Sequence, residues 1–413
     1  MRISFFVGKG GVGKSTLASA TAVRAALRGQ RVLAVSTDQA HSLGDVLGIP
    51  VEPTGSTDPV RVFTEERGGD TGGGHLDALA LDTLALLEPA WRAAAPVLAA
   101  QFPASDLKGL APEELSALPG IQEVLGLQTV AQLADSGRWD YVVVDCASTA
   151  DALRMLTLPA AFAEYVERCW PRHRRLGTTV ADIRTAATVA LVEALSAGVE
   201  SLSALLADSE RVSAHLVLTP ERVVAAEAKR TLGSLALMGV QVAELIVNQV
   251  LFQDDSYEYG NLPEHPAFDW YSARIAEQQS VLEDLAGSTG DIALVLTPHL
   301  AAEPIGPKAL GQLLDEARLR DGSAPPAPLR PVVDRECGSG LEAVYRLRLE
   351  LPQLDPGALS LGRSGDDLII GVAGLRRRVR LASVLRRCVV TDASLRGSEL
   401  TVRFRPNPEV WPA

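Results

Sequence analysis

Short, almost continuously apolar runs alternate with longer segments of helical pattern along the first three hundred residues. Such runs are typical of parallel strands that are buried on both faces of a sheet. Helices between parallel strands cover those faces, as in a doubly wound domain. We therefore predict an α/β fold with a doubly wound, mostly parallel sheet, whose strands are Ile3–Val7, Arg31–Ser36, Leu76–Leu81, Tyr141–Val144, His215–Leu218, Glu244–Val247 and Asp291–Leu296.

The pattern changes near residue 320. Residues 320–328 are rich in proline, glycine and serine, a composition that favours an extended linker. Beyond them, apolar and charged residues alternate, as in 345–351 and 400–405. Alternation with a period of two predicts short antiparallel strands. We therefore expect a first domain over 1–319, a linker over 320–334 and a small all-β sandwich over 335–413.

Two helical regions are more apolar than the sheet alone requires, namely Leu98–Leu133 and Ala181–Leu206. They could pack on the sheet or on a second copy of the chain. Alternatively, they could form an exposed groove for a client. The glycine-rich residues 68–74 are expected to form a flexible connection.

A loop of nine residues follows the first predicted strand, and an alanine-rich helical segment, Leu17–Arg28, follows the loop. It fits the pattern G-x-x-x-x-G-K-[ST], in which backbone N–H groups converge on phosphate oxygens at a helix N-terminus. Lys14 would neutralise the β- and γ-phosphates, and the Ser15 hydroxyl would ligate Mg²⁺. The alternative is a chance glycine-rich turn. The predicted ATP-binding residues are Gly8, Lys9, Gly10, Gly11, Val12, Gly13, Lys14, Ser15 and Thr16.

Two aspartates end predicted strands of the same sheet. Asp38 follows the second strand, where a carboxylate could orient the water that attacks the γ-phosphate. Its alternative role is an ordinary helix cap. Asp145 follows the apolar run Tyr141–Val144, a Walker B pattern, and would hold Mg²⁺ through a water molecule beside Ser15.

Charge and cysteine content narrow the class of protein. The chain carries a formal charge of −12, which argues against general nucleic-acid binding. From Arg335 onward it holds 13 arginines, no lysine and 9 acidic residues, so this segment carries +4 and the remainder −16. The cysteines form no C-x-x-C pair, which fits a reducing compartment and no zinc or iron–sulphur cluster. They are Cys146, Cys169, Cys337 and Cys388.

We expect a cytoplasmic protein. Met1–Val7 leads directly into the phosphate loop, so no signal peptide is expected. The most apolar stretch, Leu76–Phe102, contains both acidic and basic residues, too many for a membrane span. No stable membrane insertion is therefore expected.

The sequence K-G-G-V-G-K-[ST] resembles the deviant Walker A group of P-loop NTPases. That group includes the arsenite-pump ATPase, the tail-anchored-protein targeting ATPase, partition and division-site ATPases, and nitrogenase iron protein. The resemblance implies that Lys9 reaches across a dimer interface to the partner's nucleotide, so it implies a homodimer in which Lys9, Lys14 and Asp38 serve catalysis. A solvated surface lysine is the alternative for Lys9.

Over residues 1–315 the chain resembles the ArsA and tail-anchored-protein targeting ATPases. STDQAHSLGD, from Ser36, is similar to the first switch of that family, STDPAHSLSD. DCASTADALRMLTLP, from Asp145, is similar to its second switch, DTAPTGHTLRFLQLP. LTPE ends at Glu221 and VNQVLF contains Asn248, and the resemblance implies that both residues contact the nucleoside. Pro298 matches the proline loop near adenine.

The chain departs from this family at several positions. In the second switch, Ser148, Ala150 and Asp151 replace proline, glycine and histidine, and the lost glycine would have permitted a backbone rearrangement. In the first switch, Gln39 replaces a proline. Gly260–Pro263 stands where the eukaryotic targeting dimer has its zinc C-x-x-C, and no metalloid-binding cysteine cluster is present. Metalloid transport is therefore poorly supported.

Residues 341–406 resemble the small-heat-shock-protein-like (α-crystallin-type) sandwich that is appended to some bacterial and plastid members of the family. The likeness rests on the alternating strands and on the turn Arg376–Arg378. A role in client binding is one interpretation. A dimer edge or a structural cover is the other.

These resemblances imply a Mg²⁺-dependent homodimeric ATPase that opens and closes a surface for a hydrophobic or membrane-protein client. A nucleotide-gated binding module with little turnover is the second hypothesis, because the second switch is altered. A partition- or division-type ATPase is the third, although residues 405–413 form neither a basic DNA-binding face nor an amphipathic helix. An iron–sulphur carrier would need paired cysteines on a dimer axis.

Overall fold

The computed structural model describes residues 1–38, 42–65, 73–101, 121–158, 183–252, 265–290, 292–320, 329, 331–354, 356–372 and 375–411. The chain forms two compact units, one made of Met1–Val217 with Leu300–Ala317 and the other of Leu218–His299 with Arg318–Ala413. Several expectations fall on residues outside these ranges, namely the connection at 68–72, the linker at 321–328, Gln39, Cys169 and Gly260–Pro263.

The first unit is built on a mostly parallel sheet with the strand order β7-β1-β6-β2-β5-β3, and β4 pairs antiparallel with β5. Its strands are β1 (Arg2–Val7), β2 (Arg31–Ser36), β3 (Pro53–Thr54), β4 (Val60–Thr64), β5 (His75–Leu81), β6 (Tyr141–Asp145) and β7 (Val212–Leu218). Its helices are α1 (Lys14–Leu27), α2 (Ser42–Leu47), α3 (Thr83–Gln101), α5 (Ile121–Asp135), α8 (Ile183–Leu206) and α11 (Gly306–Asp315).

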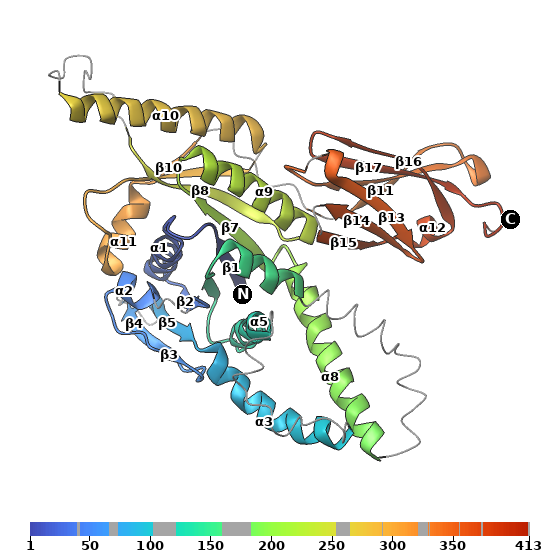
Figure 1. The fold of residues 1–413 in the computed structure, drawn as a ribbon, viewed down its shortest axis with the longest axis horizontal. Coiled ribbons are helices and arrows are strands. Elements are labelled where there is room, and N and C mark those ends of the chain that lie inside the picture. The colour runs from blue at the N-terminus through green and yellow to red at the C-terminus, as the bar shows by residue number, and fades with distance from the viewer. Residues whose placement is uncertain are drawn as a thin grey trace. The chain divides into compact units, whose positions relative to one another are not determined.

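The strand order places helices on both faces of this sheet. The chain steps from β1 past β6 to β2 and on to β5, then returns to β6 and crosses to β7. Because parallel crossovers are right-handed, this reversal puts α1 on one face and α5 on the opposite one. Figure 1 shows the sheet between α1 and α5. The α1 face is packed with small side chains such as Ala18, Ala20 and Ala22, which let the helix lie close to the strands.

The second unit contains three further strands and two long helices. β8 (Val242–Val250) pairs parallel with β9 (Ala293–Pro298), and β10 (Arg318–Leu319) pairs antiparallel with β9. Before β8 lies α9 (Arg222–Met238), and α10 (Pro266–Ser288) precedes β9. The ion pair between Lys229 and Asp284, with 2.7 Å between Nζ and Oδ2, joins the two helices.

The same unit contains two antiparallel sheets, with the orders β11-β12-β17-β16 and β13-β14-β15. The strands are β11 (Val332–Cys337), β12 (Val344–Glu350), β13 (Leu359–Ser364), β14 (Asp367–Val372), β15 (Leu375–Arg380), β16 (Cys388–Arg396) and β17 (Glu399–Pro406), with the short helices η2 (Gly340–Glu342), η3 (Pro356–Ala358) and α12 (Ser383–Arg386). One apolar core joins the two sheets and includes Leu347, Ile370, Phe404 and, from α9, Leu237.

The structure confirms the fold class, with a mostly parallel α/β region followed by an antiparallel all-β region. The short strands β3, β4 and β10 were not predicted. Strand β11 begins at Val332, inside the segment expected to be linker. Val199, Leu202 and Leu206 of α8 are buried, and α8 contacts α3 and α5, so this part of the apolar helix is a packing surface. Residues 102–120 of the other apolar region lie outside the described ranges.

Candidate nucleotide-binding site

Three strand ends meet at one edge of the first unit's sheet. Asp145, the last residue of β6, is the register partner of Phe6 on β1 and of Ser36 on β2. The phosphate loop therefore leaves the sheet beside Asp145, and Asp38 follows two residues after Ser36. Ligands of open α/β sheets bind at the carboxyl ends of the strands, which is the edge described here.

The phosphate loop has the backbone that its glycines allow. Gly11 and Gly13 have φ angles of 83° and 90°, in the left-handed region that residues with a Cβ rarely adopt. At Gly8, a Cβ would lie 2.2 Å from the carbonyl oxygen of Val217, so the loop passes against β7. Helix α1 begins at Lys14, and no acidic residue stands in its first turn, which leaves its N-terminus open to an anion.

The two lysines of the loop differ in exposure. Lys14 is buried, and its ammonium group donates a hydrogen bond of 3.2 Å to the carbonyl oxygen of Lys9. The side chain of Lys9 is exposed. The hydroxyl groups of Ser15 and Ser42 lie 2.8 Å apart, which joins α1 to the first switch.

Asp145 is the most unusual residue at this edge. Its side chain is 1% exposed, and neither carboxylate oxygen has a hydrogen-bond partner among the described residues. Burial raises the pKa of Asp145 to about 6, although the nearby Ser15 hydroxyl and Lys14 ammonium act to lower it. A buried carboxylate that accepts no hydrogen bond destabilises the folded protein. Such groups are typical of sites where a bound ligand or ion supplies the missing partner.

The end of β2 is tied to the end of β6. Both the backbone N–H and the hydroxyl of Thr37 donate to the carbonyl oxygen of Asp145, at 3.0 and 3.3 Å. The N–H of Asp38 donates to the hydroxyl of the buried Ser36 at 3.1 Å. These bonds fix the backbone that leads into the predicted catalytic aspartate.

The altered second switch forms a helix cap. The N–H of Asp151 donates to the Ser148 hydroxyl at 3.2 Å, and that hydroxyl lies 2.6 Å from the Asp151 carboxylate. The Ser148 hydroxyl therefore caps the start of the helical residues 149–158. Arg154 bonds to Asp151 and, at 3.0 Å, to Glu123 on α5. Two of the three replacements, Ser148 and Asp151, thus bond to each other, and Arg154 joins the segment to α5.

The other predicted nucleotide-binding residues belong to the second unit. Glu221 stands at the N-cap of α9 with an exposed side chain, which accepts a hydrogen bond of 2.9 Å from Arg274 on α10. Asn248 is buried near the end of β8, and its side-chain oxygen Oδ1 accepts a hydrogen bond of 2.8 Å from the Thr297 hydroxyl. Pro298 follows Thr297, so the structure brings Asn248 and the proline loop together.

Three supporting residues were missed by the sequence analysis. Ser42 lies within the first-switch motif, so its approach to Ser15 could have been anticipated. Gln278 is buried and bonds to both sides of a β-bulge, through the carbonyl oxygen of Gln249 and the N–H of Leu251, at 3.2 and 2.9 Å. No local signal marks Gln278 or Arg274, because each acts on a distant segment.

The donor set at the sheet edge suits one kind of metal. Within the described ranges, no group of three or more His, Cys, Asp or Glu residues could hold a metal alone. A single buried carboxylate beside a hydroxyl is instead what Mg²⁺ uses when phosphates and waters complete its shell. The orphaned oxygens of Asp145 and the hydroxyl of Ser15 fit such an ion.

Comparison with known proteins places the chain in a family. Residues 1–317 match the family model of anion-transporting ATPases. The chain belongs to this family of ATPases. Residues 342–404 match an HSP20-like domain found in ArsA, which accounts for the antiparallel sheets at the end of the chain. The resemblances drawn from the phosphate loop, the two switches and the C-terminal strands are thereby confirmed.

Individual relatives match different shares of the chain. Protein Rv2184c of Mycobacterium tuberculosis is 70% identical over 100% of this chain and 97% of its own. The arsenical pump-driving ATPase of Escherichia coli is 29% identical over 75% of this chain and 48% of its own. The ATPase ASNA1 homolog of Cryptosporidium parvum is 28% identical over 61% of this chain and 66% of its own. Among the residues that the structure describes, no helix has the length and apolarity needed to cross a membrane.

Proposed function

We propose that the chain is a Mg²⁺-dependent ATPase whose active site forms around the phosphate loop. The observation that carries this proposal is Asp145, because both of its carboxylate oxygens are buried near Ser15 and Lys14 and have no hydrogen-bond partner in the part of the chain that the structure describes. A magnesium ion bound by Ser15 and, through water, by Asp145 would neutralise the charge that develops on the phosphates. The ATPase domain would cover 1–319 and the β domain 335–413, in keeping with the two family matches.

The chain's own residues would divide the remaining work. The Lys14 ammonium would exchange the carbonyl oxygen of Lys9 for the β- and γ-phosphates, since it already lies under the loop. Asp38 would orient the attacking water, and the bond from its N–H to Ser36 would fix its position. Glu221, Asn248 and Pro298 would hold the nucleoside.

We infer a homodimer, because the exposed Lys9 matches the lysine that reaches the partner's nucleotide in related ATPases. We infer a cytoplasmic location, because the four separated cysteines fit a reducing compartment. Dimer closure on ATP and opening after hydrolysis would then bind and release a hydrophobic protein client. The relation to the ASNA1 homolog and to the arsenical pump-driving ATPase supports this direction. Metalloid transport is not proposed, because the chain lacks a cysteine cluster for the metalloid.

Phosphate release by the purified full-length chain tests this proposal. We expect activity with ATP and Mg²⁺, none with excess EDTA, and a loss of at least about 100-fold in Asp38→Asn because a water-orienting group is removed. Asp58→Asn, at an exposed turn, is the matched control and should keep full activity. Unchanged phosphate release in Asp38→Asn would remove Asp38 from the catalytic role.

Dimerisation requires its own measurement. Lys9→Ala should lower phosphate release and weaken ATP-dependent dimer formation in analytical ultracentrifugation. Arg28→Ala, at the far end of α1, should change neither. A chain that stays monomeric with ATP while hydrolysing it at the normal rate would overturn the shared site.

A nucleotide-gated binding module with slow turnover is the second candidate. It is favoured by the helix cap that Ser148 forms with Asp151 and by the bond from Arg154 to Glu123, which hold the second switch in place. Single-turnover measurements separate the two candidates. Slow release of phosphate after fast cleavage would support gating by this segment, whereas fast cleavage and fast release would support the ordinary ATPase.

A further inference from the structure

A pocket of about 520 Å³ opens at the C-terminal ends of α9 and α10. It is lined by these two helices, by the start of β8 and by the loops at 350–354 and 397–398 of the β domain, all within the second unit. Glu221 stands at the opposite end of α9. The volume is in the range of small-molecule sites, so the pocket is large enough for a ligand of its own.

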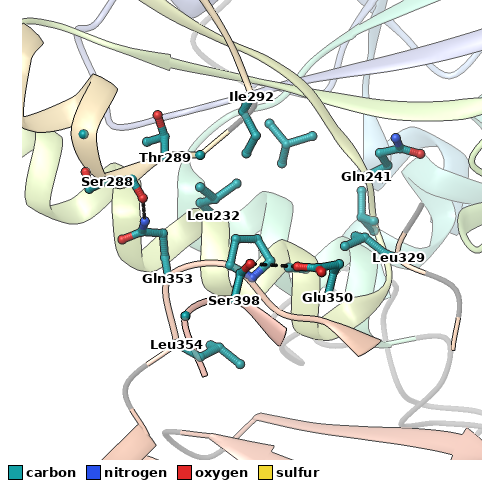
Figure 2. Close-up of a pocket in the computed structure, with 17 residues that line it drawn as sticks. Leu232, Gln241, Ser288, Thr289, Ile292, Leu329, Glu350, Gln353, Leu354 and Ser398 are labelled. Atoms are coloured by element: carbon teal, nitrogen blue, oxygen red, sulfur yellow. Dashed lines mark hydrogen bonds between the residues drawn. The ribbon is translucent and has the colours of Figure 1, made fainter. Parts of the chain in front are cut away.

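The pocket has an apolar body. Leu232 and Val242 are buried, and Ile292, Leu329 and Leu354 add partly buried side chains around them. Figure 2 shows Leu232 between Ile292 and the pair formed by Ser398 and Glu350. When an apolar ligand replaces water on such a surface, the burial of apolar area stabilises the complex.

The hydroxyl groups of the pocket wall have already used their hydrogens. Ser288 donates to the carbonyl oxygen of Asp284 at 2.6 Å, and Thr289 donates to that of Leu285 at 2.8 Å. The hydroxyl of Ser398 donates to the carboxylate of Glu350 at 2.8 Å. A hydroxyl has one hydrogen and two lone pairs, so these groups can only accept further hydrogen bonds.

The pocket holds one acidic side chain. Among the described residues that line it, Glu350 is the only charged one. The nearby guanidinium of Arg377 is already engaged by the carbonyl oxygens of Ala236 and Leu329. The C-terminal end of α10, at Ser288, adds the partial negative charge of a helix terminus. A carboxylate together with three hydroxyl groups that can only accept favours a cation that donates hydrogen bonds and disfavours an anion.

The loop that closes one side of the pocket is held firmly in place. Gln353 has a φ angle of 61°, one of two left-handed residues other than glycine in the part of the chain that the structure describes. Its amide nitrogen bonds to the carbonyl oxygen of Ser288, as Figure 2 shows. A Cβ on Gly233 of α9 would lie 3.0 Å from the Gln353 carbonyl oxygen. Local strain of this kind gathers at ligand sites, where the surroundings maintain it.

We propose that this pocket binds a small organic cation that has an apolar body and an amine head group. The apolar body packs against Leu232 and Ile292, and the amine donates to the carboxylate of Glu350 and the hydroxyl oxygen of Ser398. The site is separate from the phosphate loop in residues and in chemistry, because it favours a cation where the loop favours an anion. It gives the chain a second ligand besides the nucleotide.

Three indole compounds with different head groups test the charge preference, namely tryptamine, tryptophol and indole-3-propionate. Each is titrated into the nucleotide-free, full-length chain by isothermal calorimetry. We expect tryptamine to bind about tenfold more tightly than tryptophol, since a charge-assisted hydrogen bond is gained, and indole-3-propionate to bind most weakly. Equal affinities for the amine and the acid, or no binding of any probe at millimolar concentration, would overturn the proposal.

Substitutions in and outside the pocket test whether the probes bind there. Glu350→Gln should lower the affinity for tryptamine about tenfold and leave that for tryptophol within about twofold. Glu342→Gln, an exposed carboxylate that does not line the pocket, is the charge-matched control and should bind like the parent chain. Leu232→Trp fills the pocket and should abolish binding. If Leu232→Trp does not fold, Ser398→Trp at the exposed rim serves instead, and tight tryptamine binding by that variant contradicts the site.

Discussion

The guanidinium group of Arg377 on β15 donates a hydrogen bond of 3.0 Å to the carbonyl oxygen of Ala236, near the C-terminal end of α9, across 141 residues of sequence. A second hydrogen bond of 3.0 Å reaches the carbonyl oxygen of Leu329. Gly239, the C-cap of α9, leaves room for the guanidinium because a Cβ there would lie 3.2 Å from one of its nitrogens. A cation from the β domain thus caps a helix of the ATPase region.

Arg377→Met should weaken the attachment of the β domain to α9. Burial lowers the pKa of Arg377 to about 10, and its two hydrogen bonds go to carbonyl oxygens that would lose this donor. We expect a loss of about 2 kcal/mol in the free energy of unfolding, at about 1 kcal/mol for each hydrogen bond. Urea denaturation measures it, with Arg376→Met, an exposed neighbour on the same strand, as control. Equal losses in both variants would contradict the cap.

Asp145→Asn should stabilise the nucleotide-free protein at alkaline pH. The folded pKa of about 6 lies above the unfolded value of 3.8, so the folded state binds more protons between them and stability falls as the pH rises through that interval. Removing the charge should therefore raise the free energy of unfolding by about 2 to 3 kcal/mol at pH 8 and change it little near pH 4.

Urea denaturation of Asp145→Asn and the parent chain at pH 4.5 and pH 8 measures this difference. The variant should also lose the stabilisation that Mg²⁺ with ATP gives the parent chain, because the carboxylate that would hold the ion is gone. Asp58→Asn is the exposed control. A gain that is the same at both pH values would mean that the charge of Asp145 is not its cause.

Two glycines of the phosphate loop should respond differently to alanine. A Cβ on Gly8 would lie 2.2 Å from the backbone oxygen of Val217, whereas a Cβ on Gly10 would meet nothing within 4 Å. Gly8→Ala should therefore lower the melting temperature of the nucleotide-free chain. The free energy of unfolding should fall by about 2 kcal/mol or more. Gly10→Ala should stay within about 0.5 kcal/mol of the parent chain. Calorimetry of the two variants compares them directly, and similar losses would be inconsistent with this loop geometry.

Ser148→Ala should release the second switch. It removes the capping hydroxyl that binds the N–H of Asp151, a loss of about 1 kcal/mol for the helix start. If movement of this segment limits turnover, phosphate release should rise about fivefold, the factor that 1 kcal/mol gives. Glu200→Gln, exposed on α8, is the control. A slower rate in Ser148→Ala would show instead that the cap supports catalysis.

The sequence predicted those parts of the site that depend on local pattern. Asp145 and Asp38 could be placed because each follows a strand, and parallel strand ends share one edge of the sheet. Strand β4 was missed because its residues are mostly exposed and give no buried run. The bond from Arg274 to Glu221 joins residues 53 apart, and no periodicity connects them. Contacts of this kind depend on tertiary packing, which a single sequence does not encode locally.

The sequence left the packing of the β domain open. Client binding, a dimer edge and a structural cover were all possible, and the structure places Leu237 of α9 within the core of that domain. The pattern of α9 alone could not reveal this, since an apolar helix face does not specify its partner.

The shared core around Leu237 limits how these two regions could be separated. A gene shortened to end before Val332 would encode α9 with Leu237 exposed to water and with the carbonyl oxygen of Ala236 deprived of its arginine. The newly exposed apolar surface would make the shortened protein prone to aggregate. Loss of the β domain in evolution would therefore require compensating changes in α9.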